Sequence, residues 1–110
     1  MMAEQHPSKA YGKVYREQTA DVLKAFGAFN DAVFSKDREI PRKYQELIAL
    51  AVGLTTQCQF CIEGHTALAV DAGASDQELA ETAWIAAALR AGGAFAHGRI
   101  AFQTAAEHRH

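Results

Sequence analysis

Two cysteines and a histidine in the stretch TQCQFCIEGH, residues 56–65, are the side chains best placed for chemistry. Cys58, Cys61 and His65 follow one another at intervals of three and four residues. On a helix that begins at Cys58 this spacing puts all three on one face. The chain has two cysteines in all, and both lie within this one helical turn. The pattern therefore predicts two sulfurs and an imidazole as close neighbours.

A cysteine at the start of a helix is in an activating environment. The unpaired N–H groups and the positive dipole end of the helix favour the thiolate over the thiol, whose ordinary pKa is about 8.5. His65 can accept the thiol proton, and a carboxylate bonded to its other ring nitrogen would orient it. Glu46 is the best candidate for that carboxylate. On a straight helix Glu46 would lie roughly 18 Å from Cys58. The chain must therefore reverse near residues 53–57 to bring Glu46 to the cysteines and His65.

Such a site can reduce a peroxide or exchange disulfides. A thiolate can attack the O–O bond of a hydroperoxide, His65 can supply a proton to the leaving alcohol, and the other cysteine can capture the sulfenic acid as a disulfide. An external dithiol must then reduce that disulfide. The same thiolate can instead attack the sulfur of a substrate disulfide. The residues favour a redox pair without separating these two substrates, and they predict no cofactor.

Two other interpretations of the cysteines remain open. Cys58, Cys61 and His65 supply three zinc ligands, and His97 or Glu46 could supply a fourth. The usual second pair of zinc ligands is missing from the sequence. The cysteines could also be inert core residues of an oligomeric or partner-binding scaffold. His97 follows a segment rich in alanine and glycine and is more typical of a structural histidine than of a catalyst.

The segment ELIALAVGLTTQCQFCIEGHTALAVDAGASDQELAE resembles the alkylhydroperoxidase D-like branch of the carboxymuconolactone decarboxylase family, and the similarity extends over about residues 22–102. The resemblance implies an all-α, oligomeric protein, often a trimer or hexamer, that reduces hydroperoxides or disulfides. It implies that Cys61 is the attacking thiolate, Cys58 the resolving cysteine, His65 the proton acceptor and Glu46 its support. The founding peroxidases carry a further histidine just before the second cysteine, where this sequence has Phe60.

The elements that position these residues are all predicted to be helices, about five to six in a single-domain bundle over residues 1–110. A short helix is expected near residues 11–16, and the stripe of Val22, Phe26, Phe29 and Val33 predicts a helix over 19–35. Pro41 is expected in the first turn of a third helix, and a fourth helix is expected to begin near Cys58 and stop at Gly73. The last predicted helices are a segment from Ser75 to Arg90, ended by Gly92 and Gly93, and a segment over 94–108.

Composition narrows the class of protein further. The chain has 110 residues, 49% of them hydrophobic, and a formal net charge of -2. These values are typical of one globular domain, and they give no general attraction to nucleic acid or to anionic membranes. The N-terminal segment lacks the apolar core of a signal peptide, and no apolar stretch is long enough to span a membrane. We therefore expect a cytoplasmic homo-oligomer. Trp84, Phe95 and Phe102 are expected in a core or an interface, with the wall of a hydrophobic pocket as the alternative.

Overall fold

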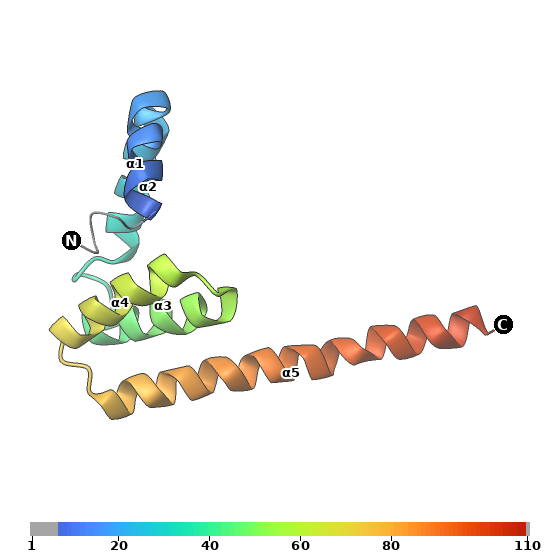
Figure 1. Ribbon diagram of the computed structural model, residues 1–110. Helices are drawn as coiled ribbons and strands as arrows, with labels where there is room; N and C mark the ends of the chain where they lie inside the picture. The colour runs from blue at the N-terminus through green and yellow to red at the C-terminus, as the bar shows by residue number, and fades with distance from the viewer. Residues whose placement is uncertain (1–6, 110) are drawn as a thin grey trace. The chain divides into compact units, whose positions relative to one another are not determined.

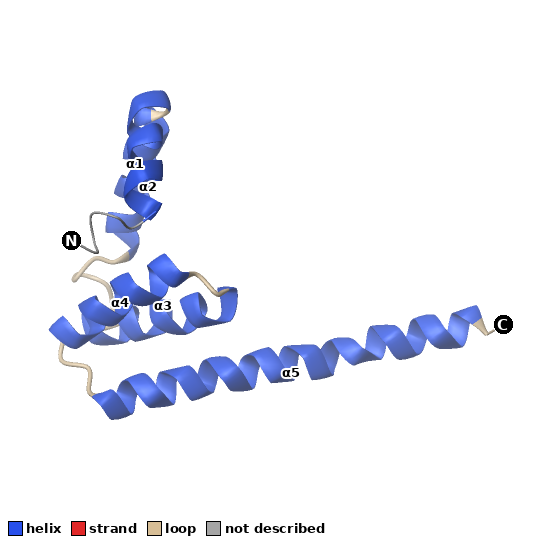
Figure 2. Ribbon diagram, viewed as in Figure 1, coloured by secondary structure: helices blue, strands red, loops and turns tan. Residues whose placement is uncertain are grey.

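The computed structural model describes residues 7–109, and these contain five helices and no strand. The helices are α1 (Pro7–Gln18), α2 (Ala20–Val33), α3 (Arg42–Thr56), α4 (Gln59–Asp71) and α5 (Asp76–His108) (Figures 1 and 2). The prediction of an all-α fold with five to six helices is confirmed. None of the described helices is both long enough and apolar enough to cross a membrane.

Contacts divide the chain into two compact units, Met1–Arg42 and Lys43–His110. In the first unit α1 and α2 form a helical hairpin, and Thr19 is the residue between them. The Thr19 hydroxyl donates to the Tyr15 carbonyl at 3.1 Å. The apolar stripe of α2, from Val22 to Val33, is exposed in the structure. Phe26 and Phe29 in this stripe are each 64% exposed. That the whole chain forms a single domain stays a prediction.

The second unit has a small core built by three helices. Leu47 and Leu50 of α3, Ala69 of α4 and Ala86 of α5 are its buried apolar side chains. The largest side chain that is fully buried in the described part is polar, the carboxylate of Glu46. Burying a carboxylate is costly unless it is hydrogen-bonded, which directs attention to what Glu46 contacts.

Helix α4 ends at a glycine, as the sequence predicts. Gly73 has a φ of 99°, a left-handed conformation that costs a residue with a Cβ about 1–2 kcal/mol. The Gly73 N–H donates to the Val70 carbonyl and the Ala74 N–H to the Ala69 carbonyl, both at 2.9 Å. This pair of bonds is the Schellman motif, which satisfies carbonyls that the helix end leaves unpaired.

Helix α5 begins where the capping box predicts. The Ser75 hydroxyl accepts from the Glu78 N–H at 3.1 Å, and the Glu78 carboxylate accepts from the Ser75 N–H at 2.9 Å. Two side chains connect α5 to α3. Lys43 forms an ion pair with Glu78 at 2.9 Å, and the Arg90 guanidinium donates to the Thr55 carbonyl. Together these contacts fix the first half of α5 beside α3.

The predicted break at Gly92 and Gly93 is wrong. Helix α5 continues through both glycines for 33 residues, and neither of them has a positive φ. Glycine lowers helix propensity by about 1 kcal/mol per residue but does not force the chain out of the helix. Alanine-rich segments on both sides supply enough propensity for the helix to propagate across the pair. The two helices predicted over 75–108 are therefore one.

Candidate active site

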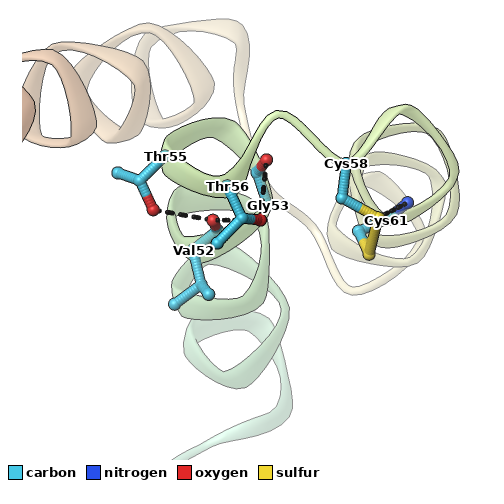
Figure 3. Close-up of a disulfide and its surroundings, with 6 residues drawn as sticks. All are labelled: Val52, Gly53, Thr55, Thr56, Cys58 and Cys61. Carbon is cyan, nitrogen blue, oxygen red and sulfur yellow. Dashed lines mark hydrogen bonds between the residues drawn. A yellow bond between two sulfur atoms is a disulfide. The ribbon is translucent and has the colours of Figure 1, made fainter.

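The chain reverses between α3 and α4 where the sequence requires it. The hydroxyls of Thr55 and Thr56 donate back to the Val52 carbonyl at 2.7 and 3.0 Å, in the last turn of α3 (Figure 3). Gln57 then takes a φ of 56°, a left-handed conformation that is uncommon outside glycine. The Cys58 N–H donates to the Gly53 carbonyl at 3.0 Å, which closes the turn. Two residues thus suffice to reverse the chain.

Cys58 is the N-cap of α4. Its backbone is extended, with φ -96° and ψ 96°, and its sulfur accepts from the Cys61 backbone N–H at 3.2 Å. A sulfur here occupies the place of the usual capping oxygen and satisfies an N–H that the helix cannot pair. Cys58 and Cys61 are joined in a disulfide with a Cα–Cα distance of 5.2 Å (Figure 3). The pair predicted to cycle between thiols and disulfide is seen in its oxidised form.

Glu46 of α3 and His65 of α4 form a close pair. The histidine Nδ1 lies 2.6 Å from Glu46 Oε1, slightly closer than the usual distance of about 2.7–2.9 Å in a charge-assisted N–H···O hydrogen bond. The Glu46 side chain is fully buried, whereas 22% of the His65 side chain is exposed. The carboxylate therefore holds the ring from the inside, with Nδ1–H as donor, and the lone pair of a neutral ring is then on Nε2. His65 follows Cys61 by one turn on α4.

Gly53 permits the close approach of α3 to the disulfide. It is buried, and a Cβ added to it would lie 3.1 Å from Cys61 Cβ and 3.6 Å from the Ile62 backbone nitrogen. Real Cβ atoms seldom come so close, so only glycine fits without a shift of α4. The sequence alone did not reveal this role of Gly53. A glycine inside a strong helical pattern was the signal that could have found it.

Two further residues that the sequence singled out, Phe60 and His97, are exposed. Phe60 lies between the two cysteines and is 64% exposed. His97 is on the exposed surface of α5, with its Nδ1 3.0 Å from the Gly93 carbonyl one turn earlier. Over residues 7–109 no three side chains of His, Cys, Asp or Glu are grouped as a metal site. The structure thus brings together Cys58, Cys61, His65 and Glu46 on α3 and α4, and their catalytic roles stay predictions.

Comparison with known proteins places this arrangement in a family. The chain is 40% identical over 94 residues to the uncharacterized protein 4 in the cox locus of Paracoccus denitrificans, which covers 86% of this chain and 83% of that protein. It is 38% identical over 60 residues to an uncharacterized protein of Haemophilus influenzae, covering 54% of this chain and 51% of that protein. Neither name states an activity.

Solved structures share the fold. A protein from Methanobacterium thermoautotrophicum superposes with a TM-score of 0.74 and 31% identity, over 82% of this chain and 97% of that one. The apo form of a carboxymuconolactone decarboxylase family protein from Legionella pneumophila superposes with a TM-score of 0.66 and 28% sequence identity, over 74% of this chain and 71% of that one. The family's own sequence profile matches residues 20–104. The chain belongs to the carboxymuconolactone decarboxylase family, as an alkylhydroperoxidase D-like member.

Proposed function

We propose that this protein is a thiol-dependent peroxidase that cycles Cys58 and Cys61 between two thiols and a disulfide. One observation carries the proposal: the disulfide lies at the first turn of α4, one turn before a histidine that is held by a buried carboxylate. A sulfur pair, a proton carrier and a group that orients the carrier are what two-step thiol oxidation needs. Membership of the family supports this class of activity.

In the first step the reduced Cys61 attacks a hydroperoxide ROOH. A bond forms between the sulfur and one peroxide oxygen while the O–O bond breaks, so the sulfur is oxidised to a sulfenic acid and the peroxide is reduced. The other oxygen leaves as ROH with a proton from Nε2 of His65, which has taken it from the thiol. Glu46 stabilises the transient imidazolium through Nδ1. Phe60 has no ionisable group, so it cannot assist His65 in carrying the proton.

In the second step Cys58 resolves the sulfenic acid. Its thiolate attacks the Cys61 sulfur, the S–S bond forms, and the oxygen leaves as water after taking a proton. The Cys61 backbone N–H, which already points at Cys58 Sγ, stabilises that thiolate before the attack. An external dithiol then returns two electrons and two protons and restores both cysteines. A small disulfide in place of the peroxide would be reduced by the same pair.

The test counts free thiols per chain under anaerobic conditions, before and after one equivalent of cumene hydroperoxide. Wild type is compared with Cys58→Ser and Cys61→Ser, and the metal content of each sample is measured. We expect wild type to lose two thiols rapidly, Cys58→Ser to accumulate a sulfenic acid, and Cys61→Ser to be inert. Serine also caps helices well, so Cys58→Ser should keep α4 intact.

Each other outcome has a definite meaning. Thiols that survive the peroxide but are consumed by a small disulfide would assign the protein to disulfide reduction. Thiols that neither reagent touches would refute the redox role. In that case about one tightly held zinc per chain would indicate a zinc protein whose helicity falls with a chelator, and its absence would indicate a scaffold. A sulfenic acid found only in Cys61→Ser would exchange the roles of the two cysteines.

A further inference from the structure

Helix α5 exposes a line of aromatic side chains on the side away from the core. Trp84, Phe95 and Phe102 are 75%, 77% and 76% exposed, among the most exposed large apolar residues in the described chain. Thr82 and Ala86, by contrast, are buried at 8% and 5%. At 100° per residue the three aromatic residues lie within about 20° of one another, and roughly 180° from the buried pair. The helix thus has one face against its own core and an opposite face without cover from the described chain.

The aromatic residues belong to a regular seam. The positions on this face follow one another at intervals of four, three, four, three and four residues, which is the spacing of the contact positions in a coiled coil. The seam spans roughly 27 Å of helix. We call these six residues the α5 seam; none is charged, and they are Trp84, Ala88, Ala91, Phe95, Gly98 and Phe102.

The α5 seam is complementary to itself when one copy is reversed. Its members lie in pairs at equal distances on either side of Gly93: Trp84 with Phe102, Ala88 with Gly98, and Ala91 with Phe95. Two antiparallel copies that cross at Gly93 therefore meet in matched layers. Phe95 of each copy faces an alanine of the other, and the layer of Ala88 and Gly98 contains only small residues.

We propose that α5 pairs antiparallel with α5 of a second copy of this chain, about a two-fold axis that passes near Gly93. This contact lies outside the redox site and does not depend on the proposed function. A two-fold interface uses the same patch on both subunits, which is the property that the α5 seam has. A partner of different sequence would have no reason to match this reversal symmetry.

The area available approaches that of the smaller specific interfaces. A fully buried aromatic side chain removes about 150–250 Å² from water. Because three quarters of each is exposed here, the three of the α5 seam can contribute roughly 340–570 Å² per copy. Stable interfaces bury about 800 Å² per partner. Ile85, which lies at the edge of the seam and is 60% exposed, adds to this area. Gly92 and Ala94 beside the crossing point allow the two backbones to approach closely.

Cross-linking tests the register. All chains carry Cys58→Ser and Cys61→Ser, so that they have no native thiol. Chains with Ala88→Cys are mixed with chains that carry Gly98→Cys and a tag of different length, so that a mixed disulfide can be recognised by its size. The new side chain at Gly98 would meet only the Phe102 ring, at 3.9 Å. Because the paired helices hold the two thiols at an effective concentration in the millimolar range, we expect about tenfold more mixed disulfide than from Ala88→Cys with Gln103→Cys. Equal yields from the two mixtures would overturn the proposed register.

The mass in solution tests the contact itself. We expect wild type to sediment at twice the 11.9 kDa of the chain or at a higher even multiple. The double variant Trp84→Glu, Phe102→Glu should have half the wild-type mass, and the control Gln103→Glu should keep it. A two-fold contact produces dimers and can also join two trimers into a hexamer, and in both assemblies its loss halves the mass. A monomeric wild type, or a double variant of unchanged mass and helicity, would refute the proposal.

Discussion

Replacing Gly53 by alanine tests whether the approach of α3 to the disulfide is as close as described. The added Cβ would meet Cys61 Cβ at 3.1 Å and the Ile62 backbone nitrogen at 3.6 Å. Neither atom can rotate away, because one belongs to a disulfide and the other to the backbone of α4. Helix α4 must therefore shift by a few tenths of an ångström, against the contacts that hold it.

Gly64 provides a matched control. It too lies inside a helix, but an added Cβ there meets nothing within 4 Å. Alanine in place of glycine stabilises a helix by about 1 kcal/mol, so Gly64→Ala should raise the stability by that amount. Gly53→Ala has the same gain in propensity, from which overpacking subtracts about 1–3 kcal/mol. The two variants should differ by about 1–3 kcal/mol in free energy of unfolding.

Urea and thermal unfolding followed by circular dichroism would measure this difference. Each 1 kcal/mol corresponds to a shift of roughly 4–8 °C in Tm for a domain of this size. Both variants should be compared at one protein concentration and in the same state of association, because association also shifts Tm. If Gly53→Ala and Gly64→Ala raise Tm equally, the close contact at the disulfide is refuted.

Three further predictions concern substitutions of single residues. Glu46→Gln should lower the free energy of unfolding by about 1.5–3 kcal/mol, because it loses a charge-assisted hydrogen bond. It should also slow peroxide reduction by about 10²–10⁴-fold in stopped-flow thiol assays. The control Glu63→Gln, at an exposed position, should change neither quantity. The pKa of Glu78 is lowered from 4.5, first by the Ser75 backbone N–H. The ionised Glu78 therefore stabilises the fold above pH 4.5, and this contribution is lost as the pH falls through the lower pKa of the folded protein. In Glu78→Gln the urea concentration at the midpoint of unfolding should therefore depend less on pH in this acid range. Gly73→Ala should cost about 1–2 kcal/mol in urea unfolding, because φ at this position is positive; a neutral effect would contradict the Schellman motif.

Local signals in the sequence were enough to predict most of the helix boundaries. Ser75 and Glu78 form the capping box that their spacing indicates, and Gly73 ends α4 in the left-handed conformation that favours glycine. These features depend on residues within one or two turns, so the sequence contains all of their physics. The reversal before Cys58 was also predictable, since Glu46 can reach His65 only if α3 and α4 are antiparallel.

Features that depend on other parts of the chain were not predictable in this way. Gly53 and Gly92 are both glycines in a helix, but the first is pressed against α4 and the second has nothing within 4 Å. Only the tertiary structure separates a glycine required by a neighbour from one that the helix tolerates. Likewise the stripe with Phe26 correctly predicted a helix, but periodicity reports which face is apolar and not what covers it.

The position of Cys58 at the start of α4 also affects how readily the pair accepts electrons. In the disulfide its sulfur is neutral, whereas after reduction the same atom can hold a negative charge beside the Cys61 N–H and the positive end of the helix. The dipole alone favours such a charge by about 0.3–1 kcal/mol. For a two-electron couple about 1.4 kcal/mol corresponds to 30 mV, so α4 raises the reduction potential by roughly 6–20 mV. The helix thus makes the disulfide easier to reduce, and it does so at a position that also serves as the cap of the helix.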